Sequence, residues 1–79
     1  MKPGEAELVK RLTDRLEHLS ADSVYAHRAS GLRGSLLRYL ACFEAGEALS
    51  REQQAQLDEL MDYGFEILEL AAKELRAKR

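Results

Sequence analysis

Residues that could carry metal, thiol or acid–base chemistry are few and widely spaced in this chain. The only two histidines, His18 and His27, fall on different predicted helices without a neighbouring cysteine or inward-facing carboxylate, which is a poor ligand set for zinc. The single cysteine, Cys42, lies in the last turn of a predicted helix, where the negative end of the helix dipole disfavours the thiolate. No spacing of Ser, His and Asp, or of Cys and His, indicates an activated nucleophile. We therefore predict that the protein is not an enzyme and binds neither a metal nor a cofactor.

Four carboxylates follow one another at helical spacing in the last third of the chain: Asp58, Asp62, Glu66 and Glu69. Carboxylates on one face can bind a hard cation or act as an acid–base pair. Metal sites in helical bundles, however, project carboxylates and histidines inward, commonly as Glu-x-x-His, and this spacing does not occur here. Because the row lies away from the apolar stripe of its helix, we interpret it as a solvated face. The alternative is electrostatic complementarity with arginines of the preceding helix or of a partner.

The segment 27–35 places two glycines and two serines inside an otherwise amphipathic helical pattern. Each interior glycine costs about 1 kcal/mol relative to alanine. We favour close packing of a second helix against Ser30, Gly31 and Gly34, since small residues let two backbones approach. The alternatives are glycines that a solvated face merely tolerates, and a phosphate or ligand site served by the nearby arginines. Neither the GxGxxG nor the GxxxxGKS/T spacing of phosphate loops is present in this segment.

Hydrophobic periodicity predicts an all-α fold of three helices. The first covers about residues 5–19, where leucines recur at helical spacing. Ser20 is predicted to cap the start of the second helix, with Leu19 and Val24 as a hydrophobic staple around the cap. The first helix is therefore expected to end, and the second to begin, within one or two residues of Ser20.

The second helix is predicted over about residues 21–45. Its apolar stripe, from Tyr25 to Phe43, passes both glycines without a change of phase, which favours one continuous helix. The alternative is two short helices joined at Ser30–Gly31, because interior glycines weaken a helix.

The third helix is predicted over about residues 51–77. It opens with a capping box, in which Ser50 is the N-cap and Gln53 reaches back from the third helical position. Before it, Gly46 is a suitable residue to follow the C-terminus of the second helix. The link between the two helices is therefore short.

These lengths predict a long antiparallel hairpin, formed by the helices over 21–45 and 51–77. The first helix is shorter and is tied to the start of the second, so it is expected to cover only the end of the hairpin far from Gly46. An apolar groove at the turn end then lacks a third helix, and we expect a two-fold homodimer to complete a bundle there. The predicted interface combines the small residues with apolar residues at the turn end: Ser30, Gly31, Gly34, Leu37, Leu40, Phe43, Leu57 and Leu60.

Length and composition are those of one small globular domain, residues 1–79, with frayed ends at residues 1–4 and 78–79. Twelve basic and fourteen acidic residues give a formal net charge of −2, which argues against a dedicated nucleic-acid binder. A single cysteine cannot form an internal disulfide. Since we also expect no signal peptide and no apolar run that crosses a bilayer, the expected location is the cytoplasm.

The function expected from this architecture is protein–protein interaction or scaffolding by a small helical module that acts as a homodimer. The alternative is a small regulator associated with nucleic acid. It would use a basic patch on the first two helices, formed by Arg11, Arg15, Arg28 and Arg33. No aromatic residues interleave with these arginines, as base-stacking platforms require.

Overall fold

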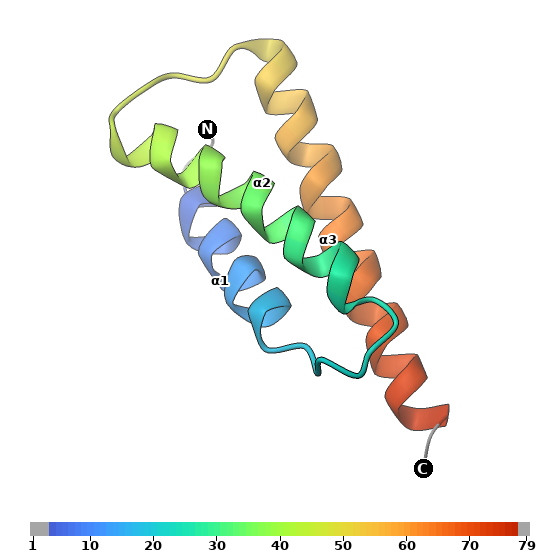
Figure 1. Cartoon of the computed structure of the whole chain (residues 1–79). Helices are drawn as coiled ribbons and strands as arrows, with labels where there is room; N and C mark the ends of the chain where they lie inside the picture. The colour runs from blue at the N-terminus through green and yellow to red at the C-terminus, as the bar shows by residue number, and fades with distance from the viewer. Residues whose placement is uncertain (1–3, 78–79) are drawn as a thin grey trace.

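Three helices and two connections make up residues 4–77, the part of the chain that the structure, a computed structural model, describes. α1 spans Glu5–Glu17, α2 spans Ala26–Glu44 and α3 spans Arg51–Ala77, and no strand occurs within residues 4–77. The all-α, three-helix prediction is confirmed. Every pair of helices is in contact, and α3 runs past the ends of both other helices (Figure 1). The overall extents are 44 × 19 × 17 Å.

The predicted fraying at residues 1–4 and 78–79 concerns, apart from Gly4, residues outside the described part. Gly4 is the N-cap of α1 in the left-handed conformation, with φ 78°, which glycine adopts without steric strain. Its carbonyl accepts a hydrogen bond from the Leu8 N–H at 3.2 Å. Gly4 is thus part of the capped start of α1.

The connection between α1 and α2, residues 18–25, is longer than predicted because two serines hold it in turns. Ser20 Oγ accepts a hydrogen bond from the backbone N–H two residues ahead at 3.2 Å, and Ser23 Oγ accepts an equivalent bond at 3.2 Å. Such bonds stabilise turns in competition with a helix. α2 therefore begins at Ala26, so the predicted N-cap at Ser20 is wrong. The predicted staple is wrong as well, since the Val24 side chain is 73% exposed.

α2 runs unbroken through Gly31 and Gly34, which confirms the prediction of one continuous helix. The helix ends where Gly46 takes a left-handed conformation with φ 77°. The N–H groups of Gly46 and Glu47 each donate a 3.0 Å hydrogen bond to a carbonyl of the last helical turn. This pair of bonds is the Schellman motif, and it confirms Gly46 as the terminating residue.

The capping box at the start of α3 is also confirmed. The Gln53 N–H donates to Ser50 Oγ at 3.1 Å, and the Ser50 N–H donates to Gln53 Oε1 at 2.9 Å. Two backbone donors that the first helical turn cannot satisfy by itself are thereby paired.

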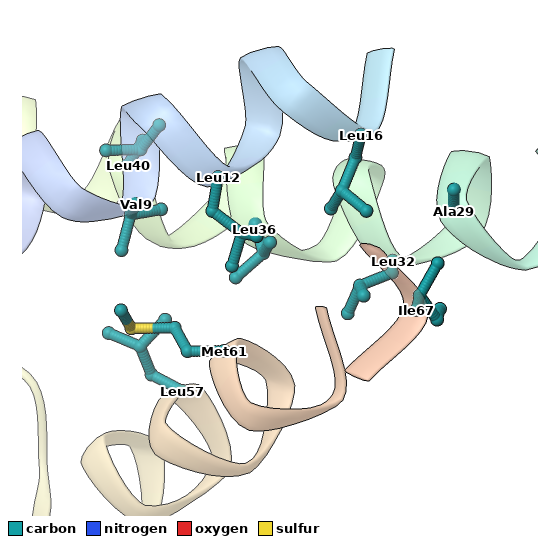
Figure 2. Packing of buried hydrophobic residues seen from close by; sticks show 10 residues of the cluster. All are labelled: Val9, Leu12, Leu16, Ala29, Leu32, Leu36, Leu40, Leu57, Met61 and Ile67. Atoms are coloured by element: carbon teal, nitrogen blue, oxygen red, sulfur yellow. The ribbon is translucent and has the colours of Figure 1, made fainter. Parts of the chain in front are cut away.

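The core lies between the three helices, and α1 extends along it to the end near the α2–α3 connection. Glu5, at the start of α1, accepts a hydrogen bond on Oε1 from Gln54 Nε2 at 2.8 Å, so the beginnings of α1 and α3 meet. Thirteen helical residues are about 20 Å long, against about 28 Å for the nineteen of α2, so α1 covers most of α2. Figure 2 shows the packed side chains, which are Val9, Leu12 and Leu16 of α1, Ala29, Leu32, Leu36 and Leu40 of α2, and Leu57, Met61 and Ile67 of α3.

The prediction that the turn end lacks a third helix is wrong. Leu40 and Leu57, both predicted at a dimer interface, are 6% and 0% exposed and lie close to Val9 in the core (Figure 2). The physical reason is the connection over residues 18–25, which is long enough for α1 to fold back along α2.

Within residues 4–77, no helix combines the length and the apolar character needed to cross a bilayer.

Candidate functional site

An open groove with a volume of about 640 Å³ lies between α2 and α3, and α1 contributes no residue to its walls. The α2 wall consists of side chains on successive turns of one helix face. The α3 wall begins at the capping box and follows that helix for about three turns. The lining residues are Ser35, Arg38, Tyr39 and Cys42 from α2, and Gln53, Gln56, Glu59, Leu60 and Tyr63 from α3.

A hydrogen bond between two side chains bridges the groove. Tyr39 Oη donates to Gln56 Oε1 at 2.8 Å and so links α2 to α3. The rings and chains of Tyr39 and Leu60 are half-buried against the core, whereas Tyr63 is 39% exposed. The groove therefore combines the apolar and aromatic surface of Tyr39, Leu60 and Tyr63 with several polar and charged side chains, and such a mixture can bind a partner with both kinds of group.

The surroundings of Cys42 in this groove raise the pKa of its thiol. Its hydrogen bond with the Glu47 side chain raises the pKa of Cys42, and burial and the negative charge of Glu47 act in the same direction. A raised pKa lowers the fraction of nucleophilic thiolate at neutral pH. Cys42 thus contributes to the groove as a small, weakly polar side chain.

The structure divides the predicted interface residues among three environments. Leu60 lines the groove, and Leu37 and Phe43 are exposed elsewhere on α2. Leu40 and Leu57 belong to the core, as described above. The small residues of the segment 27–35 that were predicted at the interface are all exposed on α2: Ser30, Gly31 and Gly34.

The glycine that makes a close helix contact is on α3, not on α2. A Cβ atom added at Gly31 or Gly34 would meet nothing within 4 Å. Within residues 4–77, the prediction that a second helix packs closely against these glycines is therefore wrong. A Cβ atom at Gly64 would lie 2.8 Å from Leu12 Cδ2. Sequence reasoning missed Gly64 as a contact residue, and its signal is its place in the middle of the apolar stripe of the third helix.

The four arginines of the nucleic-acid alternative do not gather on one face. Arg11 and Arg15 line a separate hollow of about 390 Å³ between α1 and α3, and Arg11 Nε lies 4.0 Å from a carboxylate oxygen of the same helix. Arg28 and Arg33 are five positions apart on α2, which corresponds to about 140° around the helix axis. A duplex needs its cationic partners on one surface, and this arrangement does not favour such binding.

The acidic row of α3 is largely a solvated face, as interpreted from the sequence. Asp62, Glu66 and Glu69 are exposed, and Glu69 Oε1 lies 3.4 Å from Lys73 Nζ. Asp58 is half-buried and accepts a hydrogen bond from the neighbouring Gln54 at 3.1 Å. In the described part of the chain, no three His, Cys, Asp or Glu side chains lie close enough together to hold a metal ion.

His18 sits at the C-terminus of α1 in contact with Asp14. Its Nδ1 lies 2.7 Å from the Asp14 carbonyl oxygen and 3.7 Å from Oδ1 of the Asp14 side chain. The hydrogen bond to the backbone of Asp14, followed by the charge of its carboxylate, raises the pKa of His18 above the ordinary value of 6.5. Because the pKa is raised on folding, the stabilising contribution of His18 is present below about pH 6.5. It is lost as the pH rises through the folded-state pKa.

NMR titration of the His18 ring is expected to report a pKa above 6.5. In Asp14→Asn the carboxylate charge is removed but the backbone carbonyl remains, so the pKa is expected to fall only part of the way back. A pKa that is the same in both proteins would contradict the role assigned to the Asp14 side chain.

Comparison with known proteins finds no relative for this chain. No protein-family model, no curated protein and no solved structure matches it. The function proposed below therefore rests on the geometry and chemistry of the groove between α2 and α3.

Proposed function

We propose that this protein is a small, non-catalytic, cytoplasmic interaction module that binds a helical protein surface in the groove between α2 and α3. In its simplest form the partner is a second copy, so that the module acts as a homodimer. The proposal treats α2 and α3 as an antiparallel hairpin whose open side is completed into a bundle by the partner.

The observation that carries the proposal is the open groove itself, in which Tyr39, Leu60 and Tyr63 lie among polar and charged side chains. α1 covers the opposite side of the α2–α3 pair and adds nothing to the groove walls, so a partner could reach Tyr63 and Leu60 without displacing α1. A domain of 79 residues buries little surface by itself, and association is a common source of additional stability at this size. The raised pKa of the Cys42 thiol favours a binding role over covalent catalysis, and one free thiol suits a reducing compartment.

Light scattering over a concentration series tests the proposal. We expect the mass to rise from 8.9 kDa towards twice that value as the protein reaches high micromolar concentration. The groove variant Tyr63→Lys is expected to remain monomeric, because a charge then lies where the partner excludes water. A wild-type chain that stays monomeric throughout would overturn the homodimer.

Phe65→Lys is the matched control for this experiment. Phe65 is an aromatic residue on the same helix, 43% exposed against 39% for Tyr63, but it lines the hollow beside α1 and not the groove. We expect this variant to associate like the wild type. Equal loss of association in both lysine variants would show that general surface hydrophobicity, and not the groove, holds the dimer together.

A further inference from the structure

The two walls of the groove carry charges of opposite sign. Arg38 projects from α2 and Glu59 from α3, and both are exposed. Within residues 4–77 neither forms an ion pair: Arg38 Nη2 donates only to Ser35 Oγ, at 3.4 Å, and Glu59 has no hydrogen-bonded or ionic partner. The groove thus presents one unpaired cation and one unpaired anion to whatever covers it.

These two side chains lie at a similar height along the groove. Tyr39 contacts Gln56, and the earlier residue Val24 contacts the later residue Glu74, so moving back along α2 corresponds to moving forward along α3. Arg38 is one position back from Tyr39, and Glu59 is three positions forward from Gln56. At 1.5 Å per residue they lie within about 3 Å of one level.

We propose that two copies of the chain dock groove to groove about a two-fold axis running along the groove, so that α2 of each copy lies on α3 of the other and Arg38 pairs with Glu59 of the second copy. This inference rests on the homodimer proposed above and specifies its arrangement. A two-fold axis along the groove exchanges the two walls and keeps each residue at the same height. Arg38 of each copy therefore lies opposite Glu59 of the other copy, which gives two such pairs in the dimer. An axis across the groove would place α2 on α2 and leave both charges without an opposite partner.

The same arrangement gives a role to the small residues on α2. Ser35 lines the groove opposite Tyr63, and its Oγ donates to the Gly31 carbonyl at 3.4 Å, so Gly31 lies one turn away on the same side of the helix. When the walls are exchanged, Tyr63 of the second copy lies over Gly31 and Ser35. The space around Gly31, where an added Cβ meets nothing within 4 Å, then accommodates an aromatic ring.

A charge swap at Arg38 and Glu59 tests this arrangement in the full chain by sedimentation equilibrium. Arg38→Glu and Glu59→Arg each place like charges opposite one another at two symmetric sites, so each is expected to raise the dimer Kd at least tenfold. The double variant R38E/E59R restores opposite charges and is expected to return to within about threefold of the wild-type Kd. Asp62→Arg is the control, because it changes the net charge as Glu59→Arg does but does not line the groove.

The possible outcomes separate this inference from the proposed function. A wild-type chain that does not dimerise overturns the homodimer and, with it, this arrangement, but not the binding of another helical partner in the groove. A wild-type dimer whose Kd is insensitive to the single swaps, or is weakened further by the double variant, overturns only the arrangement. Weakening by each single swap with recovery in the double variant supports it, provided that Asp62→Arg binds like the wild type.

Discussion

Replacement of Leu57 by alanine is expected to lower the free energy of unfolding by about 3 kcal/mol, as buried leucines typically do. The Leu57 side chain is fully buried beside Val9, Leu40 and Met61, so its truncation leaves a cavity between all three helices (Figure 2). Denaturant titration followed by circular dichroism measures the loss. The destabilisation is expected in dilute solution, where the chain is monomeric, because the contacts of Leu57 are all within one copy.

Leu37→Ala is the control for this prediction. Leu37 is a leucine of α2 that is 41% exposed, and its truncation is expected to cost less than about 1 kcal/mol. Similar losses for the two variants would contradict the core described here. If Leu57→Ala left the stability unchanged but impaired association, Leu57 would lie at an intermolecular interface, as the sequence predicted.

Replacement of Gly64 by leucine is expected to destabilise the fold by about 3 kcal/mol through overpacking. The space that a side chain would need is filled by Leu12, whose Cδ2, Cδ1 and Cγ atoms would lie 2.8, 3.1 and 3.2 Å from an added Cβ. Leu12 is itself 1% exposed and is held by neighbours on every side. The intrinsic preference of leucine over glycine in a helix, about 0.8 kcal/mol, is too small to offset this clash.

Two further variants separate the clash from other effects of the substitution. Gly34→Leu makes the same change in an open position, so it is expected to stabilise the monomer by up to about 0.8 kcal/mol. In the double variant L12A/G64L the new side chain can occupy the space that Leu12 vacates. The combined loss is therefore expected to be smaller than the sum of the single losses by at least 1 kcal/mol. Additive losses would show that Gly64 is not in contact with Leu12.

Local signals in the sequence predicted the helix ends that depend on local chemistry. Ser50 and Gln53 satisfy each other within one turn, and Gly46 supplies a left-handed residue, so neither feature requires knowledge of distant contacts. The apolar stripe of α2 likewise predicted one continuous helix through Gly31 and Gly34. These features could be predicted because the interacting groups are within a few residues of one another.

The start of α2 could not be predicted in the same way. A serine hydroxyl that bonds a nearby backbone N–H can cap a helix or close a turn, and Ser20 satisfies either description. Two further contacts favour the turn over a helix start at Ser20. They are the second serine turn at Ser23 and the distant hydrogen bond from the Val24 N–H to Glu74. The resulting connection over residues 18–25 then determines where α1 lies.

The candidate site was predicted only in part, for a related reason. The periodicity marks Leu40, Leu57 and Leu60 as apolar positions, but it does not say which of them α1 covers. Because α1 extends to the start of α3, Leu40 and Leu57 are buried. The groove between α2 and α3 is instead lined by Leu60 and Tyr63. Arg38 and Glu59 line the same groove only because α2 and α3 pack together.

The intrinsic helical preference of its residues is not what stabilises α2 as a helix. Its two interior glycines together lower its helical preference by about 2 kcal/mol relative to alanine, and in proteins most helical stability comes from the packing of an apolar face. What keeps residues 26–44 helical is the burial of Ala29, Leu32, Leu36 and Leu40 against α1 and α3. The secondary structure of α2 and the core of the protein must therefore form and unfold in one cooperative step.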